Sequence, residues 1–195
     1  MTAAIPAPLQ PRRANDAHYT PDAVARTCVA ALQIRSPLFV VEPSVGGGAF
    51  ARAANAWWPQ AYVHGVDIDP AAPGFTDCSD PDPDVRAWSA EVAEDIRLSA
   101  GRPIDLVVGN PPYNQALDHV RIALEASGAT GMLLRLGFLA GQKRRAFWDA
   151  HPPFAVHVLS RRPSFTEGGT DASEYAFYEW HRGFTGTPAL RWLTW

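Results

Sequence analysis

The chain of 195 residues is 47% hydrophobic and 19% charged, with a formal net charge of −3. This length fits one domain with a buried core, and the apolar fraction with seven Trp, five Tyr and nine Phe excludes a fully disordered chain. No run of about 18 apolar residues predicts a membrane-spanning helix, and residues 1–13 lack the pattern of a signal peptide. Cys28 and Cys78 suggest neither a disulfide framework nor a zinc cluster. We therefore expect a soluble, cytoplasmic protein.

The small net charge conceals a segregation of acidic and basic residues along the chain. Residues 66–95 contain nine acids and one base, whereas residues 135–162 contain six bases and one acid. Of the 17 basic residues, only Lys143 is a lysine. Two solvated faces explain such blocks as well as two binding surfaces do. The net charge alone therefore does not exclude a nucleic-acid partner.

Periodicity and turn signals predict alternating strands and helices after a flexible N-terminal tail, residues 1–17. The first helix is expected to use Thr20 as its cap and Pro21 as its first residue. Residues 70–84, acidic and rich in proline, are predicted to be a loop. The predicted helices are 20–32, 49–58, 115–126 and 141–149, and the predicted strands are 38–41, 61–66, 104–108, 131–136, 156–160, 175–180 and 189–195.

Repeated β-α-β units imply an α/β fold of the Rossmann-like, doubly wound kind. We expect a mostly parallel seven-stranded sheet, with segments 175–180 and 189–195 as an antiparallel closing strand pair. No internal repeat or second domain is indicated, so residues 18–195 are predicted to form one domain. Ligands of such sheets bind at the carboxyl ends of the strands, which directs attention to three segments that follow predicted strands.

Two of these segments suggest a nucleoside ligand. Glycines 46–48 follow the first strand and would let the backbone approach a ligand closely, although the sequence is neither a phosphate-binding loop nor a regular G-x-G-x-x-G. Asp67 lies 21 residues after Gly46, at the end of the next strand, where an acid typically accepts hydrogen bonds from ribose hydroxyls. The alternatives are a plain tight turn and a solvated acid, and Asp69 is the alternative to Asp67.

The third segment, Asn110-Pro111-Pro112-Tyr113, directly follows an apolar strand. Two consecutive prolines remove two backbone donors and fix two φ angles, which gives a rigid turn rich in carbonyls. The Asn110 side-chain oxygen and the Pro111 carbonyl can accept two hydrogen bonds from a planar amino group, and Tyr113 can stack on a planar substrate. An ordinary Pro-Pro turn is the alternative, but the four-residue match in this position is a specific signal.

These motifs together resemble the S-adenosylmethionine-dependent amino methyltransferases, most closely the DNA adenine-N6 type. The motifs are Tyr19-Thr20-Pro21, Glu42-Pro43 with Gly46 and Gly48, Asp67, and Asn110-Pro111-Pro112-Tyr113. Residues 161–165 and 173–180 look like the end of small phage-type adenine methyltransferases. The resemblance covers about residues 18–182 and implies one methyltransferase catalytic domain. Glu42 departs from the family, which usually has the shorter Asp.

The resemblance implies a role for each motif. At the target, Asn110 and the Pro111 carbonyl bind the amine within the rigid turn that Pro112 completes, and Tyr113 stacks on the base. The implied cofactor is S-adenosylmethionine, with S-adenosylhomocysteine as product. Its implied contacts are Tyr19, Thr20 and Pro21 at the methionine end, Glu42, Pro43, Ser44, Gly46 and Gly48 along the methionine and ribose, Asp67 at the ribose hydroxyls, Ile68 on the adenine, Asp95-Ile96 at the adenine amine (alternatives Glu91 and Glu94), and Asn110.

The implied activity is methyl transfer to the N6 amine of adenine in DNA, with a flipped-out or single-stranded target base. The setting would be restriction-modification or a phage-infected bacterial cytoplasm. Phe138 and Phe165 are further candidates for stacking on the base, and a homodimer could add target recognition, for which the chain leaves little room. The six histidines show no ligand spacing, so no metal site is expected. The residues expected to contact DNA phosphates, rather than to form a solvated helix face, are Lys143, Arg144, Arg145, Arg161 and Arg162.

Competing functions remain open at this point. Cytosine N4, an RNA guanine N2 and a protein glutamine amide are planar amines that a similar turn can hold. The Tyr-Thr-Pro element and the terminal segment favour adenine in DNA. A catalytically silent methyltransferase-like subunit is the rival from another class, and the intact Asn110–Tyr113 turn and glycine turn argue against it.

Overall fold

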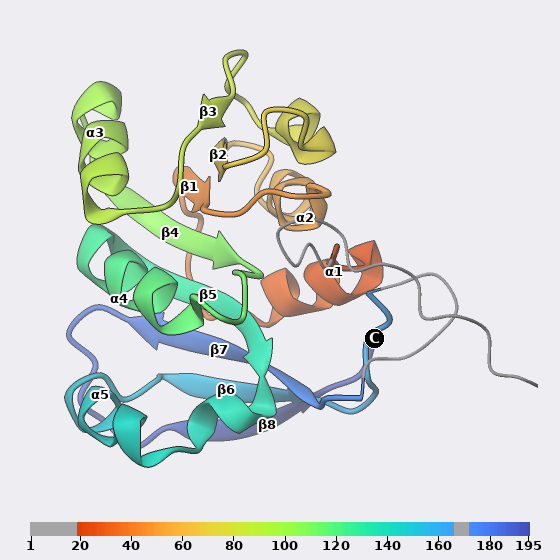
Figure 1. Cartoon of the computed structure of the whole chain (residues 1–195), viewed down its shortest axis with the longest axis vertical. Coiled ribbons are helices and arrows are strands. Elements are labelled where there is room, and N and C mark those ends of the chain that lie inside the picture. Colours follow the sequence, from red (N-terminus) through yellow and green to blue (C-terminus); the bar gives the residue numbers. More distant parts are fainter. Residues whose placement is uncertain (1–18, 166–171) are drawn as a thin grey trace, which may run out of the picture.

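The computed structural model describes residues 19–165 and 172–195, so the tail predicted for residues 1–17 lies outside the described residues. Within these residues, eight strands form one sheet in the order β3-β2-β1-β4-β5-β7-β6-β8 (Figure 1). The elements are α1 (Asp22–Ala31), β1 (Phe39–Glu42), α2 (Ala49–Trp57), β2 (Tyr62–Asp67), a 3₁₀ helix η2 (Pro73–Asp77), β3 (Asp84–Val85), α3 (Ala90–Ala100), β4 (Ile104–Gly109), α4 (Ala116–Ala126), β5 (Ser127–Arg135), the 3₁₀ helices η3 (Leu136–Leu139) and η4 (Gln142–Arg144), α5 (Arg145–Ala150), β6 (Ala155–Leu159), β7 (Tyr175–His181) and β8 (Ala189–Leu193).

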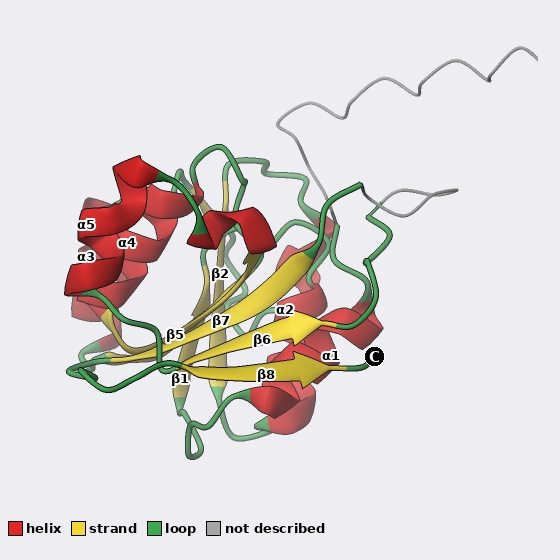
Figure 2. Cartoon of the chain, turned by 90° about the horizontal axis from the view of Figure 1, so that it is seen from below, coloured by secondary structure: helices red, strands yellow, loops and turns green. Residues whose placement is uncertain are grey.

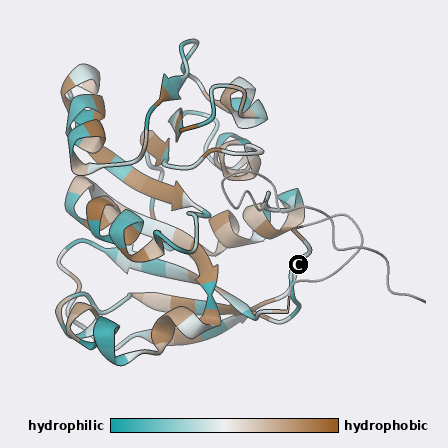
Figure 3. Ribbon diagram, in the orientation of Figure 1, coloured by the Kyte–Doolittle hydropathy of each residue, from teal (hydrophilic) through white to brown (hydrophobic). Residues whose placement is uncertain are grey.

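Helices cover both faces of the sheet, α1 and α2 on one and α3, α4 and α5 on the other (Figure 2). Successive residues of a strand point to opposite faces, so Leu106 of β4 packs with α1 and α2, and its neighbour Val107 packs on the other side. Because both faces are covered, the central strands are continuous apolar runs, and Figure 3 shows β4 as mostly hydrophobic. None of the described helices is long and apolar enough to cross a membrane.

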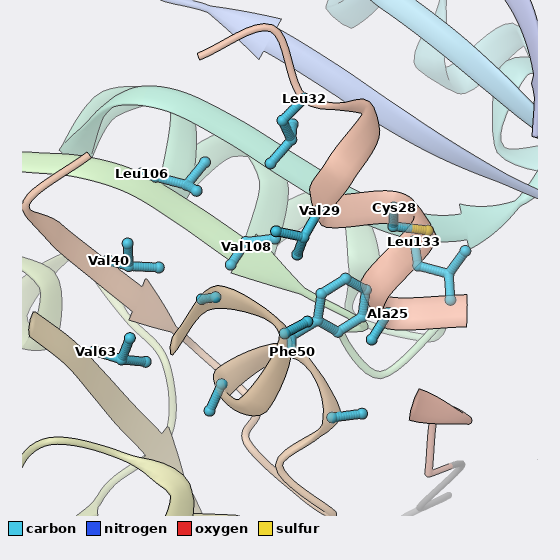
Figure 4. Packing of buried hydrophobic residues seen from close by; sticks show 14 of the residues in the cluster. Ala25, Cys28, Val29, Leu32, Val40, Phe50, Val63, Leu106, Val108 and Leu133 are labelled. Carbon is cyan, nitrogen blue, oxygen red and sulfur yellow. The ribbon is translucent and has the colours of Figure 1, made fainter. Parts of the chain in front are cut away.

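Helix α1 buries one face against the sheet. Ala25, Cys28, Val29 and Leu32 recur at helical spacing and are buried among strand residues (Figure 4). The predicted cap is wrong: the helix begins at Asp22 with Pro21 as its N-cap, and no side chain caps it. The Thr20 hydroxyl instead accepts a hydrogen bond from the Asn110 side chain.

The predicted fold class is confirmed, with differences in detail. The sheet has eight strands rather than seven because the two-residue strand β3 ends the segment predicted as loop, and α3 fills a stretch for which no element was predicted. The predicted closing pair does not pair with itself, since β6 lies between β7 and β8. The burial pattern explains this order. Strands β7 and β6 are almost fully buried and need neighbours on both sides, whereas β8 alternates between half-buried and exposed residues and forms the edge. Strand β7 runs antiparallel to both β5 and β6.

The order of the strands creates a crevice between β1 and β4. The chain proceeds outward from β1 to β2 and β3, then returns to β4 on the other side of β1 and continues to β5. The connections after β1 and β4 therefore diverge, and a crevice opens at the carboxyl ends of these two strands. The glycine turn follows β1 and the Asn-Pro-Pro-Tyr turn follows β4, so both lie at this crevice.

Glu179 on β7 joins the far half of the sheet to the chain that leaves α1. Its carboxylate is fully buried, accepts a hydrogen bond from the Gln33 N–H at 2.7 Å, and lies 3.0 Å from His157 Nε2 and 2.7 Å from His181 Nε2. Burial raises the pKa of Glu179, but these hydrogen bonds together outweigh it, and the net pKa lies below the usual 4.5.

Replacing Glu179 by Gln should lower the free energy of unfolding at neutral pH by about 1–3 kcal/mol, because a neutral amide accepts weaker hydrogen bonds from buried donors. A carboxylate with a depressed folded-state pKa stabilises the fold above pH 4.5, and that contribution is lost as the pH falls below this value. Urea unfolding between about pH 6 and about pH 3 should therefore show a smaller acid-induced loss for Glu179→Gln than for the wild type. The exposed Glu91→Gln is the control, and equal losses in all three proteins would contradict the prediction.

Candidate functional site

A pocket of about 340 Å³ opens at the carboxyl ends of β1, β2 and β4. It brings together most of the residues predicted to contact the cofactor or the target amine. Those in its lining are Tyr19, Pro43, Ser44, Gly46, Asp67, Ile68, Asn110, Pro111, Pro112 and Tyr113. Segments more than 90 residues apart in the sequence thus share one concave site.

The glycine turn is held from below by Glu42. Gly46 and Gly48 adopt left-handed backbone angles with φ of 46° and 76°, which glycine reaches without steric cost. Glu42 is buried beneath the turn, and its Oε2 accepts a hydrogen bond from the Ala51 N–H at 2.8 Å in the first turn of α2. Burial raises the pKa of Glu42 well above its usual value, while the Ala51 N–H acts to lower it. Glu42 does not line the pocket, so the structure gives it the task of holding the turn.

The segment around η2 clamps the same turn from outside. The Gly74 N–H donates to the Gly46 carbonyl at 2.9 Å, and a Cβ on Gly74 would lie 2.4 Å from the Gly48 nitrogen. Arg52 donates to the Gly47 carbonyl and also pairs with Asp77. Gly48 is therefore packed away from the pocket, and the turn has little freedom to move.

Asp67 and Asp69 both line the pocket where β2 ends. Asp67 accepts the Gly46 N–H on Oδ2 at 2.8 Å and the Asp69 N–H on Oδ1 at 3.0 Å, whereas Asp69 Oδ1 accepts the Ala71 N–H at 2.9 Å. A carboxylate has about four lone-pair positions, so Asp67 can fix the glycine turn and still accept hydrogen bonds from a ligand.

The Asn-Pro-Pro-Tyr turn is joined to the start of the described chain by a side-chain hydrogen bond. Asn110 Nδ2 donates to Thr20 Oγ1 at 3.1 Å. Thr20 and Pro21 themselves do not line the pocket, but the neighbouring Tyr19 does, and its ring packs against the glycine turn at Gly47. Since the Asn110 amide nitrogen faces Thr20, the amide is held in one orientation, with its oxygen on the opposite side.

Tyr113 stands within a group of aromatic and cationic side chains. Its ring centre lies 5.6 Å from that of buried Tyr175 and 6.5 Å from that of Phe165, both at tilted or edge-on angles. The guanidinium carbon of Arg135 lies 4.7 Å from the Tyr113 ring centre. Burial raises the pKa of Tyr113, so the phenol stays neutral. Phe138, the other stacking candidate, is a core residue 6% exposed among α5 and β7 side chains.

The structure does not bring Asp95 and Ile96 to the pocket, and the prediction that they meet the adenine amine has no support in its geometry. Asp95 lies on α3 and pairs with Arg86 at 2.7 Å, while the Ile96 side chain is buried in the core. The segment that follows β3, Arg86-Ala87-Trp88, lines the pocket instead. The rule that ligands sit at strand ends would have found this segment, but a two-residue strand leaves almost no periodic signal.

His119, like the segment 86–88, lines the pocket but was not predicted from the sequence. It lies on α4 and lines the pocket, with its Nε2 3.3 Å from Ser44 Oγ and its Nδ1 3.2 Å from the Gln115 carbonyl oxygen. Burial lowers the pKa of His119, which favours a neutral imidazole. Lone histidines without ligand spacing are usually packing residues, so only the fold places this one beside Ser44. Among the described residues, no group of three potential metal ligands gathers.

The predicted DNA-contacting residues lie outside the pocket, and most have partners within the chain. The guanidinium of Arg144 donates to the Gly137 and Ala140 carbonyls and lies over the Phe138 ring. Arg145 pairs with Asp149, Arg162 pairs with Glu174, and Arg161 lies over the Trp195 ring. Lys143 and Arg145 are exposed.

Curated proteins match parts of the chain. The release factor glutamine methyltransferase of Mycolicibacterium smegmatis is 36% identical over 84 residues, which cover 43% of this chain and 30% of that protein. The type II methyltransferase M.XamI of Xanthomonas campestris pv. amaranthicola is 29% identical over 102 residues, which cover 49% of this chain and 19% of that protein. The match thus spans less than a third of the length of either relative. No protein-family model matches the chain.

Solved structures share the fold over most of the chain. A type I restriction-modification methyltransferase subunit from Streptococcus thermophilus has a TM-score of 0.65 at 16% identity, covering 87% of this chain and 46% of that one. An O-methyltransferase from Bacillus cereus in complex with S-adenosylhomocysteine has a TM-score of 0.58 at 14% identity, covering 85% and 84%. The chain therefore has the Rossmann-like fold of methyltransferases.

The two acids at the end of β2 can be separated by matched substitutions. Asp67→Asn should raise the dissociation constant of S-adenosylmethionine, the cofactor that the sequence resemblance implies, by about tenfold or more, because a charged acceptor is lost and the glycine turn loosens. Asp69→Asn should change it by less than about threefold, since its carboxylate caps only its own loop. Titration calorimetry measures both, and the reverse order would move the ribose contact to Asp69.

Proposed function

We propose that the chain is an S-adenosylmethionine-dependent methyltransferase that methylates the N6 amine of adenine in DNA. The observation that carries the proposal is the convergence of the glycine turn, Asp67 and the Asn110–Tyr113 turn on one pocket. Its volume of about 340 Å³ lies in the range of small-molecule sites. The two partial relatives bear methyltransferase names, one of them for a type II enzyme, which supports the proposal.

S-adenosylmethionine is the cofactor, and the pocket has the groups to hold it. Asp67 offers a carboxylate to the ribose hydroxyls, and Ile68, 53% exposed, offers an apolar surface to the adenine ring. We assign the adenine end to Arg86-Ala87-Trp88 in place of Asp95 and Ile96. Tyr19 and Ser44 remain for the methionine end, beside the glycine turn.

The chain contributes the alignment of the amine with the methyl group. When bound, S-adenosylmethionine supplies an electrophilic methyl on a sulfonium sulfur. The adenine amine is conjugated and weakly nucleophilic, so hydrogen bonds from its two N–H groups to Asn110 Oδ1 and the Pro111 carbonyl draw the nitrogen toward tetrahedral geometry. Transfer would form the C–N bond as the sulfonium S–CH₃ bond breaks and would leave neutral S-adenosylhomocysteine. The methylated nitrogen would then bear the positive charge and lose a proton to water, so the step needs no strong general base.

Tyr113 gives the target base a surface to stack on. A base paired within a duplex cannot reach a concave pocket, so the target is flipped out or single-stranded. Stacking on an aromatic ring stabilises an extruded base by about 1–3 kcal/mol. Partly exposed Phe165 packs edge-on against Tyr113, and buried Tyr175 supports the ring from the sheet, so the ring is held in place for a planar base.

A protein glutamine amide is the second candidate substrate, because one partial relative is a release factor glutamine methyltransferase. An amide presents the same planar NH₂ to Asn110 and Pro111. The aromatic group around Tyr113 and the basic segment favour a nucleobase on a charged strand over an aliphatic amide. Mass spectrometry after incubation with labelled S-adenosylmethionine and DNA, RNA or a glutamine-bearing protein separates methyladenine, methylcytosine, methylguanine and methylglutamine. Cofactor binding without transfer to any substrate would favour the silent subunit.

Asn110→Ala should reduce transfer by about 10²-fold or more, because one of the two acceptors for the amine is lost. The dissociation constant of S-adenosylmethionine should change by less than about threefold. Thr20→Val keeps both acceptors but removes the hydrogen bond that orients the Asn110 amide, so it should lower kcat by about tenfold. Full activity in Asn110→Ala would contradict the assignment of the amine acceptor.

Lys143 and Arg145 can be used to test whether the predicted phosphate-contacting residues bind DNA. Both are exposed, and their substitution leaves the carbonyl contacts of Arg144 in place. The double variant Lys143→Gln/Arg145→Gln should weaken DNA binding. It should also make the slope of log K against log salt shallower by the amount that about two phosphate contacts contribute. Fluorescence anisotropy over a salt series measures this slope. The control Arg97→Gln on α3, where the side chain is 42% exposed and pairs with Glu94, should leave the slope unchanged. An unaltered slope in the double variant would show that Lys143 and Arg145 do not contact DNA.

A further inference from the structure

Arg135 is a charged residue that contacts the Asn-Pro-Pro-Tyr turn at Tyr113. The proposed methyl transfer itself gives this residue no role. It is the last residue of β5, it is exposed, and its guanidinium carbon lies 4.7 Å from the centre of the Tyr113 ring. A guanidinium over a ring face is a cation–π contact, which is weak where water reaches it. The contact with the ring is therefore one that a stronger contact at the same ring face can replace.

The Tyr113 ring is held in place from its sides. Tyr175 is 1% exposed on β7, directly opposite Arg135 in the β5–β7 pairing, and its ring meets Tyr113 at 48°. Phe165 meets Tyr113 edge-on at 67°. These two contacts fix the ring, whereas the guanidinium lies on one of its faces. An exposed cation thus covers one face of the ring on which the proposed reaction would stack its base.

We propose that Arg135 occupies the place of the target base over Tyr113 and moves to a phosphate beside the extruded nucleotide when a strand binds. This inference rests on the proposed function and adds to it a residue that makes the site favour a base carried on a phosphodiester strand. A guanidinium and a purine are both planar and both stack on aromatic rings, so they compete for the same ring face. Base stacking is the stronger contact, and the base displaces the guanidinium.

The displaced guanidinium has a better partner on a strand than on an isolated amine. A phosphate oxygen pair accepts two parallel hydrogen bonds from a guanidinium, which is stronger than the contact with the ring. A free nucleoside or a glutamine amide brings no phosphate, so it must displace Arg135 without this compensation. The exchange therefore selects polynucleotide substrates at the moment the base enters.

The test compares two oligonucleotides that differ only beside the target adenine. One carries normal phosphodiesters, and the other carries uncharged methylphosphonate linkages on both sides of the adenine. For the wild type, neutralising these linkages should lower kcat/KM by about tenfold, because the guanidinium loses its new partner. For Arg135→Gln the loss should be about twofold or less, and on the uncharged strand this variant should equal or exceed the wild type.

Further readouts distinguish this role from a structural one. On normal DNA, Arg135→Gln should raise KM by about five- to tenfold with kcat within about twofold, and should reduce the salt slope by about one phosphate. Arg135→Lys keeps the charge without the planar group and should retain the sensitivity to neutral linkages. Arg97→Gln is the control for loss of an arginine that does not line the pocket, and the dissociation constant of S-adenosylmethionine should stay unchanged in every variant.

Equal loss on both strands in Arg135→Gln and the wild type, or a fall in kcat with unchanged KM, would overturn the role of Arg135. A wild type that transfers no methyl group to adenine in DNA would instead refute the proposed function, and the inference with it. The role of Arg135 is judged from the variant compared with the wild type, whereas the proposed function is judged from the wild type alone. The two failures are therefore distinguishable.

Discussion

The parallel pairing of β1 with β4 is the constraint on which the site depends. Because these two strands lie side by side and point the same way, the turns that follow them meet at one edge of the sheet. One turn brings glycines and the other brings Asn110-Pro111-Pro112-Tyr113. On the proposed function neither turn is sufficient alone, since one would shape the nucleoside pocket and the other would hold the amine. The reversal of strand order places them within reach of a single ligand pair.

The acidic side chains at this edge of the sheet hold the backbone around the pocket even without a ligand. Glu42 holds the first turn of α2, and Asp67 holds the Gly46 amide. A longer side chain than the usual Asp suits Glu42, because its carboxylate must reach Ala51 from beneath the turn. Two acidic side chains thus hold the backbone around the glycine turn, Glu42 at the start of the helix that follows it and Asp67 at Gly46. Preorganisation of this kind avoids the cost of ordering the turn when a ligand binds.

The sequence predicted the elements that carry strong local signals and missed those defined by contacts. Apolar runs and proline or glycine turns identified β1, β2 and β4 and the turns that follow them. The strand β3 has only two residues, so periodicity does not reveal the segment 86–88 that lines the pocket. The sequence instead suggests Asp95 as the contact of the cofactor's adenine amine. Thr20 reads locally as a helix cap, and only the fold reveals that its hydroxyl holds Asn110. The place of β6 between β7 and β8 likewise follows from long-range burial.

The basic segment shows how charge in a sequence differs from charge on a surface. Arg144 and Arg161 spread their guanidinium groups over aromatic rings, and Arg145 and Arg162 pair with carboxylates. Arginine suits both uses because it is planar and always charged, and the chain uses it at all but one of its basic positions. A contact over a ring is weak enough to exchange for a phosphate. On the proposed function, positive charge that is paired within the folded chain would thus still be available to a nucleic-acid strand, and at Tyr113 the same exchange would free a ring face for a base.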